Sequence, residues 1–171
     1  MRHPHALLYN KEEKLVRSCS FTGHREIESR HRETIGPLVV RAIEYAYNEG
    51  CRRFYLGGAL GFDTIAAQKV ILFRMTHPDA ELHLLLPCKD QEKNWSYSQR
   101  EMYGYILGQA DTVTYVSDIY TDGCMRERNR LLAERGDIMI AYLGRPRSGA
   151  AQTVRMAREL GKTVYNLFDK Q

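Results

Sequence analysis

The sequence has no long apolar run. None of its apolar stretches approaches the roughly 20 residues that an α-helix needs to cross a membrane. The opening residues, Met1-Arg2-His3-Pro4-His5, are not followed by an apolar stretch that could act as a secretory signal. We therefore expect a cytoplasmic protein with no membrane partner.

Cysteine pairs at metal-ligand spacing are also absent. The four cysteines, Cys19, Cys51, Cys88 and Cys124, form no CxxC motif, and no zinc-ligand spacing links them. In an intracellular protein such cysteines are usually reduced thiols with packing or incidental roles. The sequence therefore predicts free thiols and no metal site.

Charge of one sign is not in strong excess. The chain has 25 Lys and Arg residues against 21 Asp and Glu residues, which gives a formal net charge of +4. This excess tolerates an anionic ligand, but it is too small to indicate a nucleic-acid-binding protein by itself.

Three common motifs of nucleotide and ester chemistry are missing. The first predicted strand does not end in GxGxxG, and the second ends in glycine where a dinucleotide dehydrogenase has an acidic ribose ligand. Neither GxxxxGK[ST] nor GxSxG occurs. These absences argue against a usual dinucleotide dehydrogenase, a P-loop NTPase and an esterase of the nucleophile-elbow type.

The sequence does contain alternating strand and helix patterns. Its 171 residues, 43% of them hydrophobic, fit one globular domain over residues 15–171, preceded by a loose tail over residues 1–14. Strands are predicted over residues 15–21, 53–56, 81–86, 112–116, 137–142 and 163–167. Helices are predicted over residues 33–48, 63–75, 95–109, 125–134 and 150–160. Because the strands are almost continuously apolar, we expect an α/β, Rossmann-like fold: an open, mostly parallel sheet flanked by helices on both faces.

Residues with distinctive chemistry follow the strands rather than precede them. In an open parallel sheet, ligands bind beyond the carboxyl ends of the strands, at the point where the strand order reverses. The sequence therefore predicts a ligand site at this edge. The candidate ligand-binding residues are Thr22, Gly23, His24, Arg25, Gly57, Gly58, Gly61, Asp63, Pro87, Gln91, Trp95, Arg128, Asn129, Ser148, Gly149 and Thr153.

The glycine loop, residues 57–63 (Gly57-Gly58-Ala59-Leu60-Gly61-Phe62-Asp63), is the densest of these segments. Glycine permits positive φ and close approach of a ligand to the backbone, and the following helix start favours an anion. The alternative is a tight turn without a ligand. A carboxylate would repel a phosphate, so Asp63 is interpreted as the helix N-cap or as an acceptor for ribose hydroxyls.

The segment Thr22-Gly23-His24-Arg25 offers hydroxyl and amide donors and a guanidinium for an anion. His24 is interpreted either as a general acid or base or as a solvated surface residue. Trp95, the only tryptophan, either stacks on a base or packs in the interior.

Two further pairs have alternative interpretations. Arg128 and Asn129 either contact a base or ribose or form a solvated helix face. Ser148 and Gly149, which precede a helix, form either a second anion-binding nest or a flexible surface loop.

Five segments occur in a specific order along residues 15–167. They are residues 20–25, 57–63, 86–88 with Gln91 and Trp95, 123–125 with Arg128 and Asn129, and 148–150 with Thr153. Together they resemble the SLOG superfamily, the Rossmann-like group that contains the DprA/Smf and Lonely guy proteins, and most closely its bacterial YpsA-like branch. The resemblance implies a Rossmann-like fold, a nucleotide-related ligand such as an NAD- or ADP-ribose-like molecule, and a homodimer.

The resemblance leaves three functions open. The first is binding or sensing of a nucleotide-related ligand, with no certain cofactor. The second is N-glycosidic hydrolysis of nucleotides, as in Lonely guy enzymes, with Asp63 as the catalytic acid or base. Their motif resembles PGGxGTxxE, but two residues separate Gly58 from Gly61 in this chain, and Ile65-Ala66 offer no glutamate. The third is single-stranded nucleic-acid binding, as in DprA-like proteins.

Overall fold

Six parallel strands form one sheet in the order β4-β3-β2-β1-β5-β6. The computed structural model describes residues 16–171, so the tail predicted over residues 1–14 lies outside the described residues. The strands are β1 (Arg17–Gly23), β2 (Cys51–Leu56), β3 (Glu81–Cys88), β4 (Thr112–Ser117), β5 (Ile138–Tyr142) and β6 (Thr163–Asn166). Every pairing between neighbours is parallel, which confirms the predicted fold class.

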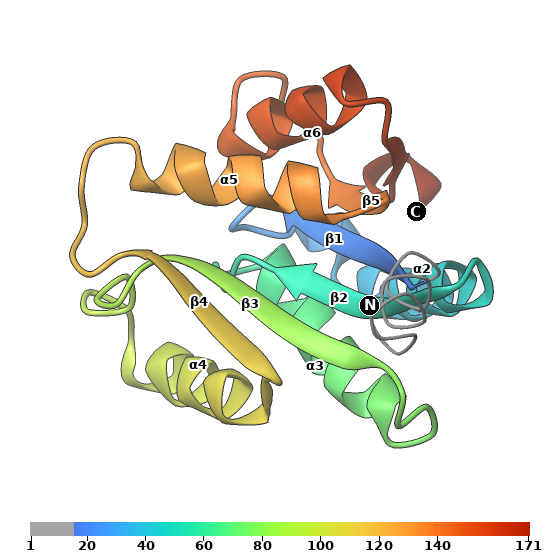
Figure 1. Ribbon diagram of the computed structural model, residues 1–171, viewed down its shortest axis with the longest axis horizontal. Helices are drawn as coiled ribbons and strands as arrows, with labels where there is room; N and C mark the ends of the chain where they lie inside the picture. The colour runs from blue at the N-terminus through green and yellow to red at the C-terminus, as the bar shows by residue number, and fades with distance from the viewer. Residues whose placement is uncertain (1–15) are drawn as a thin grey trace, which may run out of the picture.

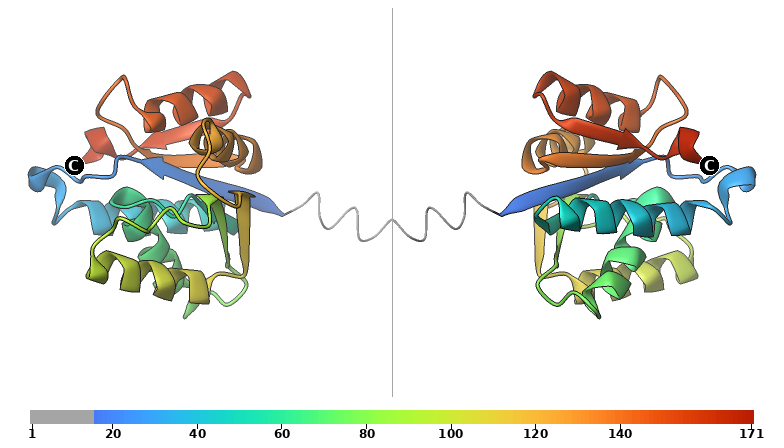
Figure 2. Two further views of the ribbon diagram at one scale, coloured as in Figure 1. Left: turned by 90° about the vertical axis from the view of Figure 1, so that its left-hand side faces the viewer. Right: turned by 90° about the vertical axis from the view of Figure 1, so that its right-hand side faces the viewer.

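Helices cover both faces of this sheet. They are α2 (Ile35–Asn48), α3 (Phe62–Arg74), α4 (Tyr97–Gln109), α5 (Cys124–Arg135) and α6 (Gly149–Glu159), with short 3-10 turns η1 (Ser29–His31) and η2 (Phe168–Lys170). Figure 1 shows α5 and α6 on one face and α2, α3 and α4 on the other, and the turned views in Figure 2 show the sheet between these two layers.

The order of the strands creates one switch point. From β1 the chain moves outward through β2 and β3 to β4, and then α5 returns it across the opposite face to β5, which pairs with β1. The loops after β1 and β5 therefore diverge to opposite faces of the sheet. A crevice at this position is where open α/β sheets bind ligands.

The central strands are buried on both faces, as their apolar sequences predict. All five residues of β5 and the middle five of β1 are buried. Burying apolar surface stabilises the fold by about 25 cal/mol per Å².

The predicted free thiols are confirmed: all four cysteines are free and buried in the interior. They are Cys19, Cys51, Cys88 and Cys124.

Most element boundaries differ from the prediction by one or two residues, and two of these differences have a clear physical reason. β3 does not stop at Leu86 but continues through Pro87 to Cys88. Proline has no N–H to donate, but none is needed here. Pairing with β2 ends at Leu84, and in the pairing with β4 the partnered residues on either side of Pro87 are Leu86 and Cys88. Helix α4 begins at Tyr97 instead of Trp95, because Ser96 forms a capping box with Gln99.

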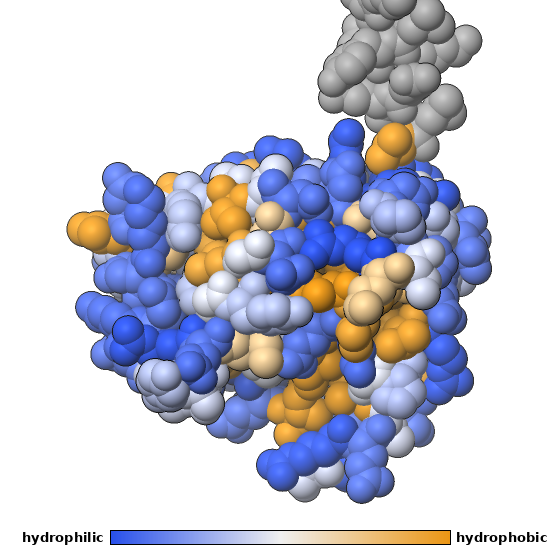
Figure 3. All heavy atoms as spheres, turned by 90° about the horizontal axis from the view of Figure 1, so that it is seen from below, coloured by the Kyte–Doolittle hydropathy of each residue, from blue (hydrophilic) through white to orange (hydrophobic). Residues whose placement is uncertain are grey.

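Several exposed apolar side chains lie on or directly after helices α3 and α4. From the side of these helices, Figure 3 shows apolar atoms in the middle of the face with polar atoms around them. The large exposed apolar residues of this region are Leu72, Met75, Tyr97 and Tyr105. Within residues 16–171, no helix is both long enough and apolar enough to span a bilayer.

Candidate functional site

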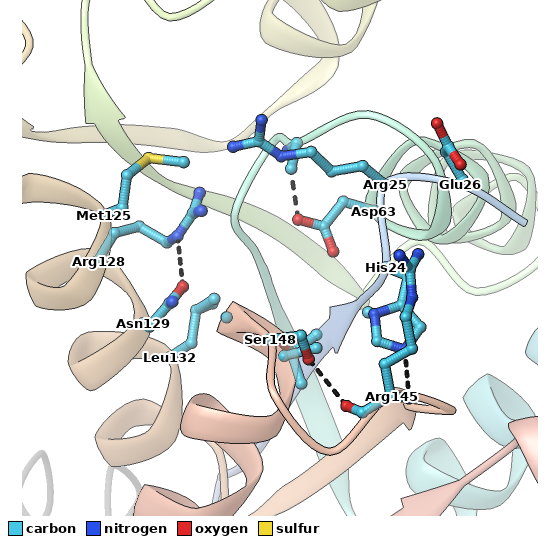
Figure 4. Close-up of a pocket in the computed structure, with 15 residues that line it drawn as sticks. His24, Arg25, Glu26, Asp63, Met125, Arg128, Asn129, Leu132, Arg145 and Ser148 are labelled. Carbon is cyan, nitrogen blue, oxygen red and sulfur yellow. Dashed lines mark hydrogen bonds between the residues drawn. The ribbon is translucent and has the colours of Figure 1, made fainter.

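A cavity of about 540 Å³ lies at the switch point, which we name the switch cavity. Its walls come from the loops after β1, β2 and β5 and from the start of α5 (Figure 4). The predicted site residues that line it are Thr22, Gly23, His24, Arg25, Asp63, Arg128, Asn129, Ser148 and Gly149. The remaining lining residues, which were not among the candidates, are Glu26, Ala59, Met125, Leu132, Arg145 and Ala150.

Four predicted site residues lie behind the cavity wall. Gln91 donates from Nε2 to the Gly58 carbonyl at 3.3 Å and to the Tyr103 hydroxyl at 3.0 Å. Trp95 packs edge-on against the same Tyr103 ring, with centroids 5.2 Å apart. Thr153 is fully buried and donates to the Gly149 carbonyl at 2.8 Å, while Pro87 is buried within β3. In this structure they support the loops rather than line the cavity.

The glycine loop has the backbone conformation that its composition predicts. Gly58 and Gly61 have φ of 67° and 76°, a region that favours glycine. A Cβ on Gly61 would lie 2.2 Å from the Arg25 carbonyl oxygen. A Cβ on Gly57 would lie 2.7 Å from the Arg128 guanidinium. The loop therefore serves as a wall on which the β1 loop and Arg128 pack.

Two amides of the glycine loop are already engaged within the chain. The Ala59 N–H donates to Asp63 Oδ2 at 3.2 Å, and the Phe62 N–H donates to the His24 carbonyl at 3.1 Å. Gly61 is the N-cap of α3 and Asp63 lies inside its first turn, so the prediction of Asp63 as N-cap was wrong. The carboxylate bonds back to the loop instead of to the helix amides.

Asp63 and Arg128 are two buried residues of opposite charge beside this loop, and none of the ion pairs among residues 16–171 joins their side chains. Each residue is only 5% exposed. Arg128 donates from Nη1 to the Gly57 carbonyl and from Nε to Asn129 Oδ1 at 2.9 Å, so the interpretation of Arg128 and Asn129 as a solvated helix face was wrong. Asp63 Oδ1 is buried and has no hydrogen-bond partner among the described residues.

Burial dominates the electrostatics of this pair. It raises the pKa of Asp63 to about 6, although Arg128, the Ala59 amide and Arg25 favour the charged form. Burial also lowers the pKa of Arg128, against the attraction of Asp63. The cavity wall therefore holds a carboxyl group that changes protonation just below neutral pH.

His24 links the loops that follow β1 and β5. It is 6% exposed, which excludes the solvated surface interpretation. Its Nε2 accepts from the Gly144 N–H at 2.8 Å and the Arg145 N–H at 3.1 Å. An accepting Nε2 is unprotonated, so a neutral ring carries its proton on Nδ1. Burial and the nearby Arg145 lower the pKa of the imidazole, which favours this neutral form.

Helix α6 begins at the edge of the cavity opposite Asp63. Ser148 is its N-cap and accepts from the Ala151 N–H at 3.1 Å. Gly149 and Ala150 line the cavity, and as the first residues of the helix their amides have no intrahelical acceptor. This helix start, with Arg145 beside it, favours an anion on that side of the cavity, whereas Arg25 lies on the side of Asp63 (Figure 4).

We expect Asp63 to make the fold less stable as pH rises. Its pKa is raised from an ordinary value of 3.8 to about 6 in the folded chain, so the native state holds a proton that the unfolded state loses. The free energy of unfolding should therefore fall by about 3 kcal/mol between about pH 4 and pH 6 through this group. Asp63→Asn should remove that contribution.

The measurement is urea unfolding of both proteins from pH 4 to pH 8. Taking the difference between the two curves cancels the carboxylates whose pKa is lowered, such as Glu28 and Asp79. A difference that stays constant over this range would contradict the assignment.

The fold and site define a class: a Rossmann-like α/β protein with a polar cavity at its switch point. Within that class the chain belongs to the YpsA family, described as the YspA SLOG family, whose model matches residues 20–164. The resemblance to the SLOG superfamily is therefore confirmed.

Relatives with curated records support this membership. The chain is 26% identical over 138 residues to the uncharacterized SPbeta prophage-derived protein YoqJ of Bacillus subtilis, covering 72% of this chain and 81% of that protein. It is 27% identical over 133 residues to a UPF0398 protein of Bacillus cereus, covering 76% of this chain and 72% of that protein.

Two solved structures share the fold. The DNA processing protein DprA of Streptococcus pneumoniae matches 88% of this chain with a TM-score of 0.63 and 15% identity. DprA of Helicobacter pylori, in a structure concerned with its single-stranded DNA binding mode, matches 90% with a TM-score of 0.64 and 19% identity. This chain covers 50% of the first protein and 66% of the second.

Proposed function

We propose that the chain binds a nucleotide-related ligand of the nucleoside phosphate type in the switch cavity. The observation that carries the proposal is the pairing of two opposed walls. Unbonded helix amides and Arg145 lie on one wall, and a buried carboxyl oxygen without a partner among the described residues, with Arg25 and Arg128 near it, lies on the other. A phosphate suits the first wall, and sugar hydroxyls suit the second.

The phosphate subsite is assigned to α6 rather than to the glycine loop. The Ala59 and Phe62 amides of that loop already donate within the chain, and the Asp63 carboxylate would repel a phosphate held beside it. At α6, the amides of Gly149 and Ala150 donate to no acceptor among the described residues. The helix dipole adds to their attraction for an anion.

Binding should be detected as a rise in melting temperature with a panel of nucleoside phosphates and NAD-type compounds. Arg25 is exposed and lines the cavity. We expect Arg25→Ala to weaken binding about tenfold to hundredfold, because it removes a charge-assisted hydrogen bond. Arg158→Ala, an exposed arginine in the last turn of α6, is the matched control and should leave affinity unchanged. No stabilisation by any compound would overturn the proposal.

An N-glycosidic hydrolase is the second candidate, because one specific observation favours it. The Asp63 carboxyl is buried and its pKa of about 6 lies near neutrality, which is the range suited to a general acid or base. Free base released from a bound nucleotide, and lost on Asp63→Asn, would establish this activity. Binding without release favours the sensing role.

Binding of single-stranded nucleic acid and formation of a homodimer remain predictions. Single-stranded DNA belongs in the same panel, since the Helicobacter pylori DprA structure concerns that ligand. Binding that falls steeply as salt rises would point to a nucleic-acid role instead. The predicted homodimer is tested by the mass of the protein in solution.

A further inference from the structure

We propose that the ligand carries two nucleosides joined by a phosphate bridge, and that a second cavity beside the switch cavity receives the second nucleoside. This inference rests on the proposed function and names its ligand class. The second cavity, which we name the side cavity, has a volume of about 580 Å³. Each cavity alone falls within the range of small-ligand sites, about 300–1,000 Å³.

The two cavities share one wall. His24, Glu26 and Arg145 line both of them. The His24 ring fixes this wall in place, because its Nε2 accepts from the Gly144 and Arg145 amides. The side cavity is completed by Ile27, Glu28, Ser29, Arg30, Arg32 and Phe168.

Arg145 supplies the charge at the shared wall. Its side chain runs beside His24 in Figure 4, and its cation contributes to lowering the pKa of that ring. Arg145 is exposed, and none of the ion pairs among residues 16–171 includes it. An unneutralised guanidinium between two cavities is suited to a phosphate group that bridges them.

The side cavity contains an aromatic ring, Phe168, that is held in position by neighbouring rings. The Phe168 ring meets the His31 ring edge-on, with centroids 4.8 Å apart, and the Tyr142 ring in a tilted arrangement, with centroids 5.1 Å apart. His31 and Tyr142 are buried and joined by a 2.7 Å hydrogen bond. The Arg30 guanidinium lies 5.6 Å from the Phe168 ring centroid. An aromatic ring with a guanidinium above it is a stacking site for a planar heterocycle.

The side cavity has acceptors for a sugar beside the Phe168 ring. Glu26 and Glu28 line it together with Arg30, Arg32 and Arg145, and the two carboxylates can accept hydrogen bonds from sugar hydroxyls. The side cavity therefore suits a base stacked on the ring and its sugar. With the phosphate subsite at α6 and Arg145 between the cavities, the two cavities together match a dinucleotide better than a mononucleotide.

The test compares ADP with two diphosphate-bridged dinucleotides, NAD and diadenosine diphosphate, by calorimetry on the full chain. We expect at least one dinucleotide to bind about tenfold more tightly than ADP, since a stacked base adds affinity of this order. Arg30→Ala should abolish most of that advantage and leave ADP binding unchanged. Arg30 is exposed and its ion pair is with Glu28, so this variant should fold normally.

The outcomes separate the two proposals. If ADP binds as tightly as both dinucleotides, or if Arg30→Ala weakens all ligands equally, the two-cavity inference fails and the proposed function stands. If none of the three compounds binds, both fail. Arg25→Ala should weaken ADP and dinucleotides alike, because Arg25 lines only the switch cavity of the two.

Discussion

Arg128→Ala is expected to lower the free energy of unfolding by about 3 kcal/mol or more at pH 8. The substitution leaves the Gly57 carbonyl without its guanidinium donor and empties the volume of a side chain that is only 5% exposed. It also removes a positive charge that favours the ionised form of Asp63. An unsatisfied buried polar group costs about 1–3 kcal/mol, and the cavity and the lost attraction add to this. Urea unfolding measures the loss directly.

The matched control is Arg130→Ala on the same helix. Arg130 is exposed and pairs with Glu127 and Glu134 on the helix surface, so its removal should cost about 1 kcal/mol or less. Equal effects of the two substitutions would contradict the structural role of Arg128.

The electrostatic part of the stability lost in Arg128→Ala can be identified by measuring the free energy of unfolding at two pH values. At pH 5 Asp63 is largely protonated, since its pKa is about 6, and little counter-charge is lost. At pH 8 the carboxylate is charged in the parent protein, and the variant leaves it uncompensated. The loss should therefore be larger at pH 8 than at pH 5, and the added substitution Asp63→Asn should remove this difference.

Gly61→Ala is the second change with a large expected effect. A Cβ at this position would lie 2.2 Å from the Arg25 carbonyl oxygen, and the residue has φ of 76°. Positive φ alone costs a non-glycine residue about 1–2 kcal/mol. The clash adds to this cost, because the nearest atoms belong to the backbone carbonyls of Arg25 and His24 and not to a flexible side chain. We expect a total loss of about 2–4 kcal/mol together with weaker ligand binding.

Gly104→Ala is the control for this substitution. Gly104 lies in the middle of α4, is exposed, and has open space where a Cβ would be. Alanine there should raise the free energy of unfolding by about 0.5–1 kcal/mol, because it is the better helix former. Thermal unfolding of both variants distinguishes the expected opposite signs, and a harmless Gly61→Ala would contradict the packing described for the glycine loop.

The fold was predictable because strand and helix patterns are local. Continuously apolar strands that alternate with helical periodicity leave few arrangements other than a parallel sheet between two helix layers. The residues that follow β1 and β5 were identified for the same reason, since they stand at the carboxyl ends of strands. His24 and Ser148 are examples, and both line the switch cavity.

The sequence did not predict which of the candidate residues line the cavity, because this depends on strand order and burial. Gln91 and Trp95 follow β3, which β2 separates from β1, so they fall short of the cavity, and no local pattern reveals this order. Arg128 and Asn129 were candidates and line the cavity, but the sequence alone could not distinguish this from a solvated helix face, because their burial against the glycine loop depends on how α5 packs. Arg145 had a usable signal, because it stands three residues after β5, the strand at which the order reverses.

The bond from the Gly144 amide to His24 has a consequence for when the site forms. The two residues lie 120 positions apart along the chain, and β1 must first be joined by β5 before the bond can close. Closing a loop of this length costs entropy that is lost before the contact can stabilise the chain. We therefore expect the candidate site to form late in folding, and a nascent chain that has not yet completed β5 cannot present it.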